Sequence, residues 1–559
     1  MSLLRLVRAA VDLPPPRHAA TSETLWIEMD DGVRLATSVW RPRGCLKAPA
    51  VLLRTPYGAR AWQTPIFLVA RLLAEAGYAA VVQDVRGRYA SEGTFTPFVH
   101  EAADGARTLA WIAERPWCDG RLGLVGFSYL AFAAWAAQAR APELVRAVAV
   151  GIGASDIHAT FYPGGAFALE TALRWAAALG EREGVPEWRL DLARAFAFRP
   201  VREADRVALR ERPWYRDWLD HPRRDAWWRA FLPELRPAPA TLQVAGWHDF
   251  FLGPQLGDYA ALAAGPAPGG APPRLVVGPW THGRYRRRAW SPRRRWFGHV
   301  ALREILAFLD RHLADAGPGD AKPVRLWELG GDRWLECDAW PPPEAASRRL
   351  YLRSAGRANT LRGDGRLDWE AAPGAEAPDR FTYDPADPVP SCGGALLGPG
   401  GVVDQREVEA RDDVLCYTSA PLERDLALAG PVRAVLFAAS SAPDTDFTAK
   451  LVAVAPDGRT ANLCEGIVRA RWRDGGAEPR WLEPELPARL EVDCWATCAR
   501  LPRGHRLRLE VSSSSFPRFD RNPNTRDDAA TAAGGVPARQ TLLHDAEHPS
   551  HVLLHALEA

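Results

Sequence analysis

The stretch RLGLVGFSYLAFAAWAAQ, residues 121–138, joins an apolar segment, a serine turn and an alanine-rich segment without interruption. The apolar part predicts a buried strand, and the alanine-rich part predicts a helix. A nucleophile on such a strand-to-helix turn needs small neighbours, because the backbone is strained and closely packed there. Gly126 meets this need for Ser128, whereas the usual second glycine is replaced by Leu130 and Ala131. Because GxS alone is common, the interpretation depends on the rest of the chain.

Other short apolar runs bounded by turns lie on both sides of this stretch, at residues 50–53, 78–82, 145–150, 242–245 and 275–277. Segments with helical spacing lie at residues 66–76 and 103–114, and another follows at 299–313. Strands that alternate with helices predict a mostly parallel sheet covered by helices. Residues 24–40 predict two antiparallel strands joined at Asp30-Asp31-Gly32.

Two regions break this alternation. Residues 157–237 are rich in Trp, Ala and Arg with helical spacing, which predicts a helical cap. From PVRLWELGGDRW, residues 323–334, short alternating segments separated by Gly, Pro and Asp run to the end, which is typical of an antiparallel jelly roll. We therefore predict an α/β domain in two parts, residues 1–156 and 238–318, a cap at 157–237, and an all-β domain at 319–559.

A serine nucleophile requires a base, and the base requires a carboxylate that orients it. Asp249 follows one predicted strand and His282 follows the next, in the chain order of an α/β-hydrolase. Asp156, after the strand at residues 145–150, is the competing acid, and we favour Asp249 on strand position and order. His248, beside Asp249, is interpreted as a packing residue. The sequence therefore predicts a Ser128–His282–Asp249 triad.

Acyl transfer also requires hydrogen-bond donors that face the developing oxyanion. The backbone N–H of Tyr129, directly after the nucleophile, is one candidate. The second must come from a loop after an early strand, where Tyr57 in VLLRTPYGAR could donate from its phenolic O–H. A tyrosine in such a loop is usually structural, so this assignment is weak from the residues alone.

Composition bounds the remaining possibilities. The 559 residues are 47% hydrophobic and 25% charged, and 70 Lys and Arg against 68 Asp and Glu give no reason to expect a nucleic-acid partner. The eight cysteines form no CxxC pair, so neither a zinc site nor a cofactor is expected. Without a signal peptide or an apolar run of membrane-spanning length, we expect a cytoplasmic enzyme with no membrane partner. The oligomeric state, including a homo-oligomer, stays open.

The motifs together resemble a known family. RTPYG (54–58), QDVRGRYASEG (83–93), GFSYLA (126–131), AGWHD (245–249), GPWTHG (278–283), YDPADPVP (383–390), APDTDF (442–447) and SSSSFPRFDRNPNT (512–525) occur in order. This set resembles the cocaine esterase and X-Pro dipeptidyl-peptidase superfamily, the CocE/NonD hydrolases. The resemblance implies an α/β-hydrolase domain, a helical cap and a jelly roll, with Ser128, Asp249 and His282 as triad. It also implies an oxyanion hole from Tyr57 and Tyr129. The family pattern GxSYxG has glycine where this chain has Ala131.

The resemblance leaves several substrates open: simple esters, α-amino acid esters, β-lactam side-chain amides and X-Pro peptides. In the α-amino acid ester hydrolases, acidic residues after the catalytic Asp hold the substrate ammonium group. Phe250 and Phe251 stand at those positions here, which favours an apolar or aromatic acyl group. The segment Arg284–Arg295 is basic and is interpreted first as a solvated loop, with contact to anionic substrates as the alternative. A rival of another class is a catalytically inactive binding protein that uses its jelly roll.

Overall fold

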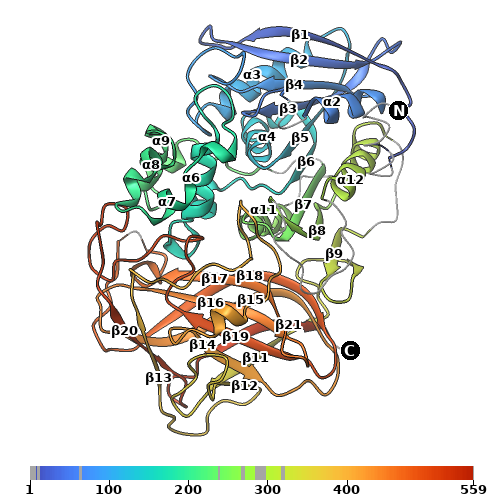
Figure 1. Cartoon of the computed structure of the whole chain (residues 1–559). Helices are drawn as coiled ribbons and strands as arrows, with labels where there is room; N and C mark the ends of the chain where they lie inside the picture. The colour runs from blue at the N-terminus through green and yellow to red at the C-terminus, as the bar shows by residue number, and fades with distance from the viewer. Residues whose placement is uncertain are drawn as a thin grey trace.

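The structure is a computed structural model that describes residues 8, 13–61, 66–236, 240–265, 271–283, 297–315, 322–476 and 478–557, with the backbone alone at 297–299. Figure 1 shows an α/β layer with its helices, a group of short helices beside it, and an all-β domain beneath both. The predicted fold class, an α/β-hydrolase domain with a helical cap and a C-terminal jelly roll, is confirmed.

The first sheet has the strand order β1-β2-β4-β3-β5-β6-β7-β8-β9-β10 among the described residues. Strands β3 to β9 run parallel to one another, whereas β1 is antiparallel to β2, β2 to β4, and β10 to β9. Its central strands are buried on both faces, which explains their continuous apolar runs. The strands are β1 (Ala20–Glu28), β2 (Arg34–Pro42), β3 (Ala48–Thr55), β4 (Ala79–Asp84), β5 (Cys118–Phe127), β6 (Val145–Gly151), β7 (Ala240–His248), β8 (Arg274–Thr281), β9 (Val324–Glu328) and β10 (Arg333–Cys337).

Helices cover this sheet, and all of them except α11 lie where the sequence predicts a helix. They are α2 (Ile66–Glu75), α3 (Glu101–Ala113), α4 (Tyr129–Arg140), α11 (Leu252–Ala264) and α12 (Phe297–His312). Between β6 and β7 the chain forms α5 (Ile157–Phe161), α6 (Leu169–Ala178), α7 (Leu192–Ala197), α8 (Ala204–Ala208), α9 (Pro213–Asp220) and α10 (Ala226–Arg229). These short helices occupy the region predicted as a cap, and they lie beside the carboxyl ends of the parallel strands (Figure 1).

The second sheet contains the remaining strands: β11 (Ala345–Arg353), β12 (Arg366–Asp368), β13 (Asp379–Tyr383), β14 (Leu415–Ser419), β15 (Leu426–Ser440), β16 (Asp446–Val454), β17 (Thr460–Arg469), β18 (Ala488–Leu501), β19 (Arg506–Ser512), β20 (Ala538–Leu543) and β21 (His551–Leu557). A short helix, α13 (Arg406–Glu409), precedes β14. Long strands such as β15 pair with more than one neighbour, so the sheet bends around a single core.

Two strands within residues 319–559, the range predicted as the all-β domain, belong to the first sheet. Strand β9 pairs in parallel with β8, and β10 folds back on β9, so both extend the first sheet. The second sheet starts only with β11. An antiparallel hairpin on the edge of a parallel sheet has the same alternating pattern as a jelly-roll hairpin, so the sequence did not distinguish them.

Candidate active site

Ser128 lies at the sharp turn between β5 and α4, with φ 56° and ψ −126°. The turn is possible because residue 126 has no side chain: a Cβ there would lie 2.1 Å from the carbonyl oxygen of Leu130. The same argument explains the unusual Ala131. A Cβ at Gly153 would lie 2.6 Å from the Ala131 Cβ, so the methyl group at 131 is accommodated opposite a glycine at 153.

The three residues predicted as a triad are brought together. Ser128 Oγ lies 2.9 Å from His282 Nε2, and His282 Nδ1 lies 2.9 Å from Asp249 Oδ2. Asp249 is fully buried, and its Oδ1 accepts a hydrogen bond of 2.8 Å from the N–H of Phe251. The carboxylate is therefore held by the backbone on one side and faces the imidazole on the other. This is the arrangement in which an acid fixes the tautomer of a general base.

The ends of β7 and β8 set this geometry. Gly246 pairs with Gly278, but His248 pairs with Thr281, so β8 carries an extra residue there. Pro279 lies in this bulge, where its missing N–H costs no ladder hydrogen bond. The bulge carries the chain from the sheet into the loop that presents His282 beside Asp249.

The competing acid lies elsewhere. Asp156 caps α5 through a hydrogen bond from the N–H of Ala159, and it pairs with Arg224 at 3.0 Å. His248 is buried, and this burial lowers its pKa to about 4. A neutral, buried imidazole agrees with the packing role that the sequence suggested.

Both expected oxyanion donors border the nucleophile. Tyr129 is the first residue of α4, so its N–H has no carbonyl partner within the helix. Its side chain is anchored beneath the site, because its hydroxyl donates to Glu101 at 2.8 Å and accepts from the N–H of Phe98 at 3.0 Å. The Tyr57 hydroxyl lies within hydrogen-bond reach of the Ser128 side chain. Burial raises the pKa of Tyr57, so the phenol keeps its proton and can donate.

Sequence reasoning missed Trp175, which lies on α6 of the cap. Its Nε1 donates a hydrogen bond of 3.0 Å to the Tyr57 hydroxyl. Its ring stacks on Tyr129 at 5.7 Å between centroids and on Trp218 at 5.8 Å. Trp175 follows Tyr57 by 118 residues in the chain, so no local sequence signal could assign it to the site.

Aromatic side chains surround the histidine. The ring centroids of Phe250 and Phe251 lie 4.4 and 5.5 Å from that of His282. Both rings belong to an apolar cluster that contains Trp214 and Trp218 of the cap and is joined by Leu397 of the all-β domain. The site is thus enclosed by three parts of the chain. The basic segment Arg284–Arg295 lies outside the described residues.

Within the described ranges, no group of three or more His, Cys, Asp or Glu side chains is placed to hold a metal ion. No described helix is long and apolar enough to cross a membrane. The chemistry that these side chains can perform is nucleophilic attack by an activated serine with general acid–base assistance.

Comparison with known proteins finds two matching family models and a similar esterase. Residues 31–284 match the family model of the X-Pro dipeptidyl-peptidase (S15 family), and residues 317–553 match that of the X-Pro dipeptidyl-peptidase C-terminal non-catalytic domain. Cocaine esterase from Rhodococcus sp. (strain MB1 Bresler) is 39% identical over 96% of this chain and 98% of its own.

Two solved structures share the whole architecture. An aminopeptidase from a marine sediment Thaumarchaeota archaeon superposes with a TM-score of 0.82 at 27% identity, covering 97% of both chains. An α-amino acid ester hydrolase superposes with a TM-score of 0.81 at 24% identity, covering 96% of this chain and 97% of its own. The chain therefore belongs to the CocE/NonD family of serine hydrolases, which includes cocaine esterase and the X-Pro dipeptidyl-peptidases.

Proposed function

We propose that this enzyme hydrolyses small carboxylic esters with an apolar or aromatic acyl group, through an acyl-enzyme on Ser128. The observation that carries the proposal is the pair Phe250 and Phe251, whose rings pack against His282 where an ammonium-binding site would need carboxylates. An apolar wall stabilises an apolar acyl group and disfavours a charged one, because burying an unpaired ammonium is costly.

The proposed reaction follows the hydrogen bonds of the triad. Ser128 Oγ attacks the ester carbonyl carbon while His282 Nε2 takes its proton, and Asp249 stabilises the resulting imidazolium. The tetrahedral oxyanion accepts hydrogen bonds from the Tyr57 hydroxyl and the Tyr129 N–H. His282 then gives the proton to the leaving alcohol as the C–O bond breaks. Water, deprotonated by His282, attacks the acyl-enzyme and releases the acid and Ser128.

Peptide hydrolysis is the second candidate, since the family model is named for X-Pro dipeptidyl-peptidases and one structural relative is an aminopeptidase. Such substrates carry a free ammonium group near the scissile bond. Glu170, a buried acid on the cap, is already occupied: it pairs with Arg174 at 2.6 Å and accepts hydrogen bonds from the N–H groups of Leu397 and Gly398. Because Glu170 is already paired, it is not free to bind a substrate ammonium group, which favours ester substrates over peptides.

The test compares kcat/KM for para-nitrophenyl benzoate, para-nitrophenyl butyrate, the para-nitrophenyl ester of L-alanine and Ala-Pro-para-nitroanilide. We expect the benzoate and butyrate to exceed the alanyl ester at least about tenfold, which corresponds to about 1.4 kcal/mol of transition-state discrimination. Ser128→Ala should lower kcat by a factor of about 10,000 or more.

Labelling with a fluorophosphonate, followed by mass spectrometry, checks the mechanism independently of the substrate. We expect one adduct, on Ser128, and none in the Ser128→Ala variant. Folded protein without an adduct would contradict the acyl-enzyme and favour the inactive binding protein. Labelled protein that prefers the Ala-Pro substrate would instead contradict the ester preference and keep Ser128 as nucleophile.

A further inference from the structure

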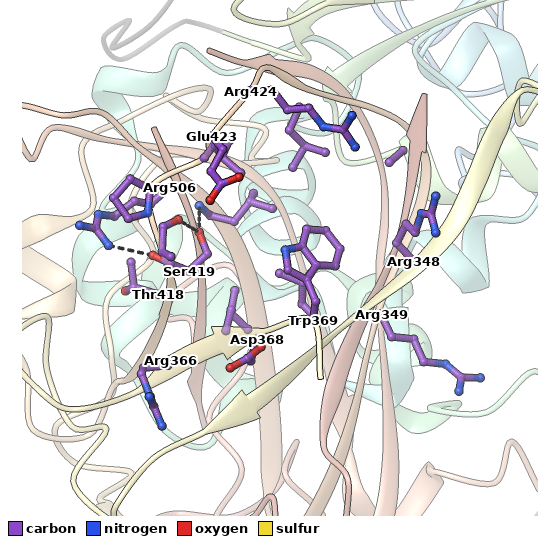
Figure 2. A pocket seen from close by; sticks show the side chains of 18 of the residues that line it. Arg348, Arg349, Arg366, Asp368, Trp369, Thr418, Ser419, Glu423, Arg424 and Arg506 are labelled. Carbon is purple, nitrogen blue, oxygen red and sulfur yellow. Dashed lines mark hydrogen bonds between the residues drawn. The ribbon is translucent and has the colours of Figure 1, made fainter. Parts of the chain in front are cut away.

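A groove of about 1710 Å³ opens on the all-β domain, between the start of β11 and the turn that follows β14. Figure 2 shows it from close by, and in Figure 1 these strands lie on the side of the domain away from the α/β layer. We call it the β11 groove. It shares no residue with the candidate active site, so its role is separate from ester hydrolysis.

One side of the groove is an unpaired strand edge. Strand β11 pairs with β21 from Ala345 to Tyr351, but with β12 only over Tyr351–Arg353. Among the described residues, no strand pairs with the second edge over residues 345–350. The N–H of Leu352 points toward β21, where it donates to the carbonyl of Ser550 at 2.9 Å. Because backbone groups alternate along a strand, the N–H and C=O of Ser347 and Arg349 point into the groove.

The floor of the groove is apolar. Leu350, Leu367 and Leu507 line it and are at most 5% exposed, because they also belong to the core of the domain. Trp369, directly after β12, is 51% exposed, and Figure 2 shows its ring inside the groove, with the side chains of Arg348 and Arg349 pointing away from it. The exposed indole is a favourable surface for apolar side chains, and the buried leucines close the groove beneath it.

The rim carries an excess of positive charge. It contains five arginines against three acidic residues, and within the described chain no carboxylate forms an ion pair with any of the five: Arg348, Arg349, Arg366, Arg424 and Arg506. Of the acids, Asp425 is already held by Arg500 at 3.2 Å and by the N–H of Arg503 at 2.9 Å. The groove therefore presents several guanidinium groups that can still bind carboxylates.

We propose that the β11 groove binds an extended, acidic peptide segment of a partner protein, which adds to the free edge of β11 as a further strand. Side chains of an added strand alternate between its two faces. Apolar residues of the segment then face the floor and contact Trp369, and the acidic residues between them pair with the rim arginines. A second copy of this chain fits poorly, because pairing two β11 edges would oppose arginine with arginine.

The probe is the full-length enzyme titrated against fluorescein-labelled Glu-Val-Glu-Val-Glu-Val-Glu-Val, followed by anisotropy and by Trp369 fluorescence, with Trp369→Phe as reference. We expect binding that weakens with salt. Arg349→Ala should raise Kd about fivefold, the effect of losing one exposed charge pair of about 1 kcal/mol. A block peptide with four Glu followed by four Val should bind at least about fivefold more weakly, because it cannot satisfy floor and rim together.

Ser347→Pro separates strand addition from simple charge attraction. It removes an N–H that points into the groove and leaves all five arginines, and proline is tolerated on an edge strand. Ser347→Ala is the matched control that keeps the N–H. We expect Ser347→Pro to weaken the peptide strongly and Ser347→Ala not to. Unchanged ester turnover and thermal midpoint show that each variant is folded.

Amide hydrogen exchange gives a readout that does not depend on the proline variant. We expect the fragment of the enzyme that covers Ser347 and Arg349 to exchange more slowly when the acidic peptide is bound. Equal binding of the alternating and block peptides, or binding insensitive to Ser347→Pro, would show an anionic-polymer site and overturn the proposal. So would no binding at all, or self-association through this edge in sedimentation velocity without any ligand.

Discussion

At the scale of single residues, one hydrogen bond links the cap to the proposed oxyanion site. Indole nitrogen can only donate, so the bond from Trp175 occupies a lone pair of the Tyr57 oxygen. The Tyr57 proton must then point elsewhere, and the Ser128 side chain lies within its reach. Trp175 is therefore a positioning residue that leaves the phenolic proton directed toward the reacting atoms.

Replacing Trp175 tests this role. Tyr57→Phe should lower kcat about 100-fold with little change in KM, because an oxyanion donor is lost. Trp175→Phe keeps an aromatic ring but removes the N–H, and we expect about fivefold lower kcat, the effect of one neutral hydrogen bond. In the Tyr57→Phe background, Trp175→Phe should have no further effect on kcat. Trp214→Phe, in the same aromatic cluster, is the control; independent effects of Tyr57 and Trp175 would contradict the coupling.

The triad residues could be predicted from the sequence because each follows a strand whose apolar run is local and continuous. Ser128, Asp249 and His282 lie directly after β5, β7 and β8, where chain order alone places them at one sheet edge. Trp175 and Leu397 could not be assigned, because their approach depends on how the cap and the all-β domain pack. Gly153 could not be linked to Ala131 either, since only the folded turn brings them together.

At the scale of elements, a buried histidine joins the ends of three strands in the all-β domain. His544 follows β20; its Nε2 lies 3.0 Å from Asp379 Oδ2 on β13 and its Nδ1 lies 3.0 Å from Glu376 Oε2. Ser354, after β11, donates to Asp379 at 2.7 Å. Burial disfavours the imidazolium, but the hydrogen bonds and charges of the two acids outweigh it and raise the pKa of His544.

The raised pKa of His544 determines how the stability of the folded state changes with pH. The folded state holds the His544 proton more tightly than the unfolded chain does, so its stabilising contribution is complete below about pH 6.5 and is lost as pH rises through the folded pKa. We expect the thermal unfolding midpoint of the wild-type chain to decrease as the pH is raised from 6 to 9. His544→Gln should lower the free energy of unfolding at pH 6 by about 3 kcal/mol. It should also make the midpoint depend less on pH. His548→Gln, a partly exposed histidine nearby, is the control, and an unchanged slope in His544→Gln would contradict the assignment.

At the scale of the whole molecule, the two family models suggest separable halves, but the core does not divide there. One apolar cluster runs from Trp247 and Leu252 of the first sheet domain into the interior of the all-β domain. Trp495 of β18 packs against Gly253 of α11, where a Cβ would lie 2.4 Å from its Nε1. The turn between β9 and β10 is also bonded to the all-β domain. The N–H of Leu329 donates to the carbonyl of Cys498 at 2.9 Å, and its carbonyl accepts from the N–H of Arg500 at 2.8 Å.

This shared core predicts the behaviour of a truncated enzyme. A chain that ends at residue 340 keeps the proposed triad and both proposed oxyanion donors, but it exposes the apolar face formed by Trp247, Leu252 and neighbouring residues to water. Leu397, which joins the cluster around Phe250 and Phe251, is also removed. We expect this chain to aggregate on expression, and any soluble fraction to bind a hydrophobic dye and to lose fluorophosphonate labelling at Ser128. Coexpression with residues 341–559 should restore part of the labelling, because the same interface can form between two chains. A soluble, fully labelled N-terminal fragment would show instead that the all-β domain is an independent module, and that the apolar contact between the domains is dispensable for the active site.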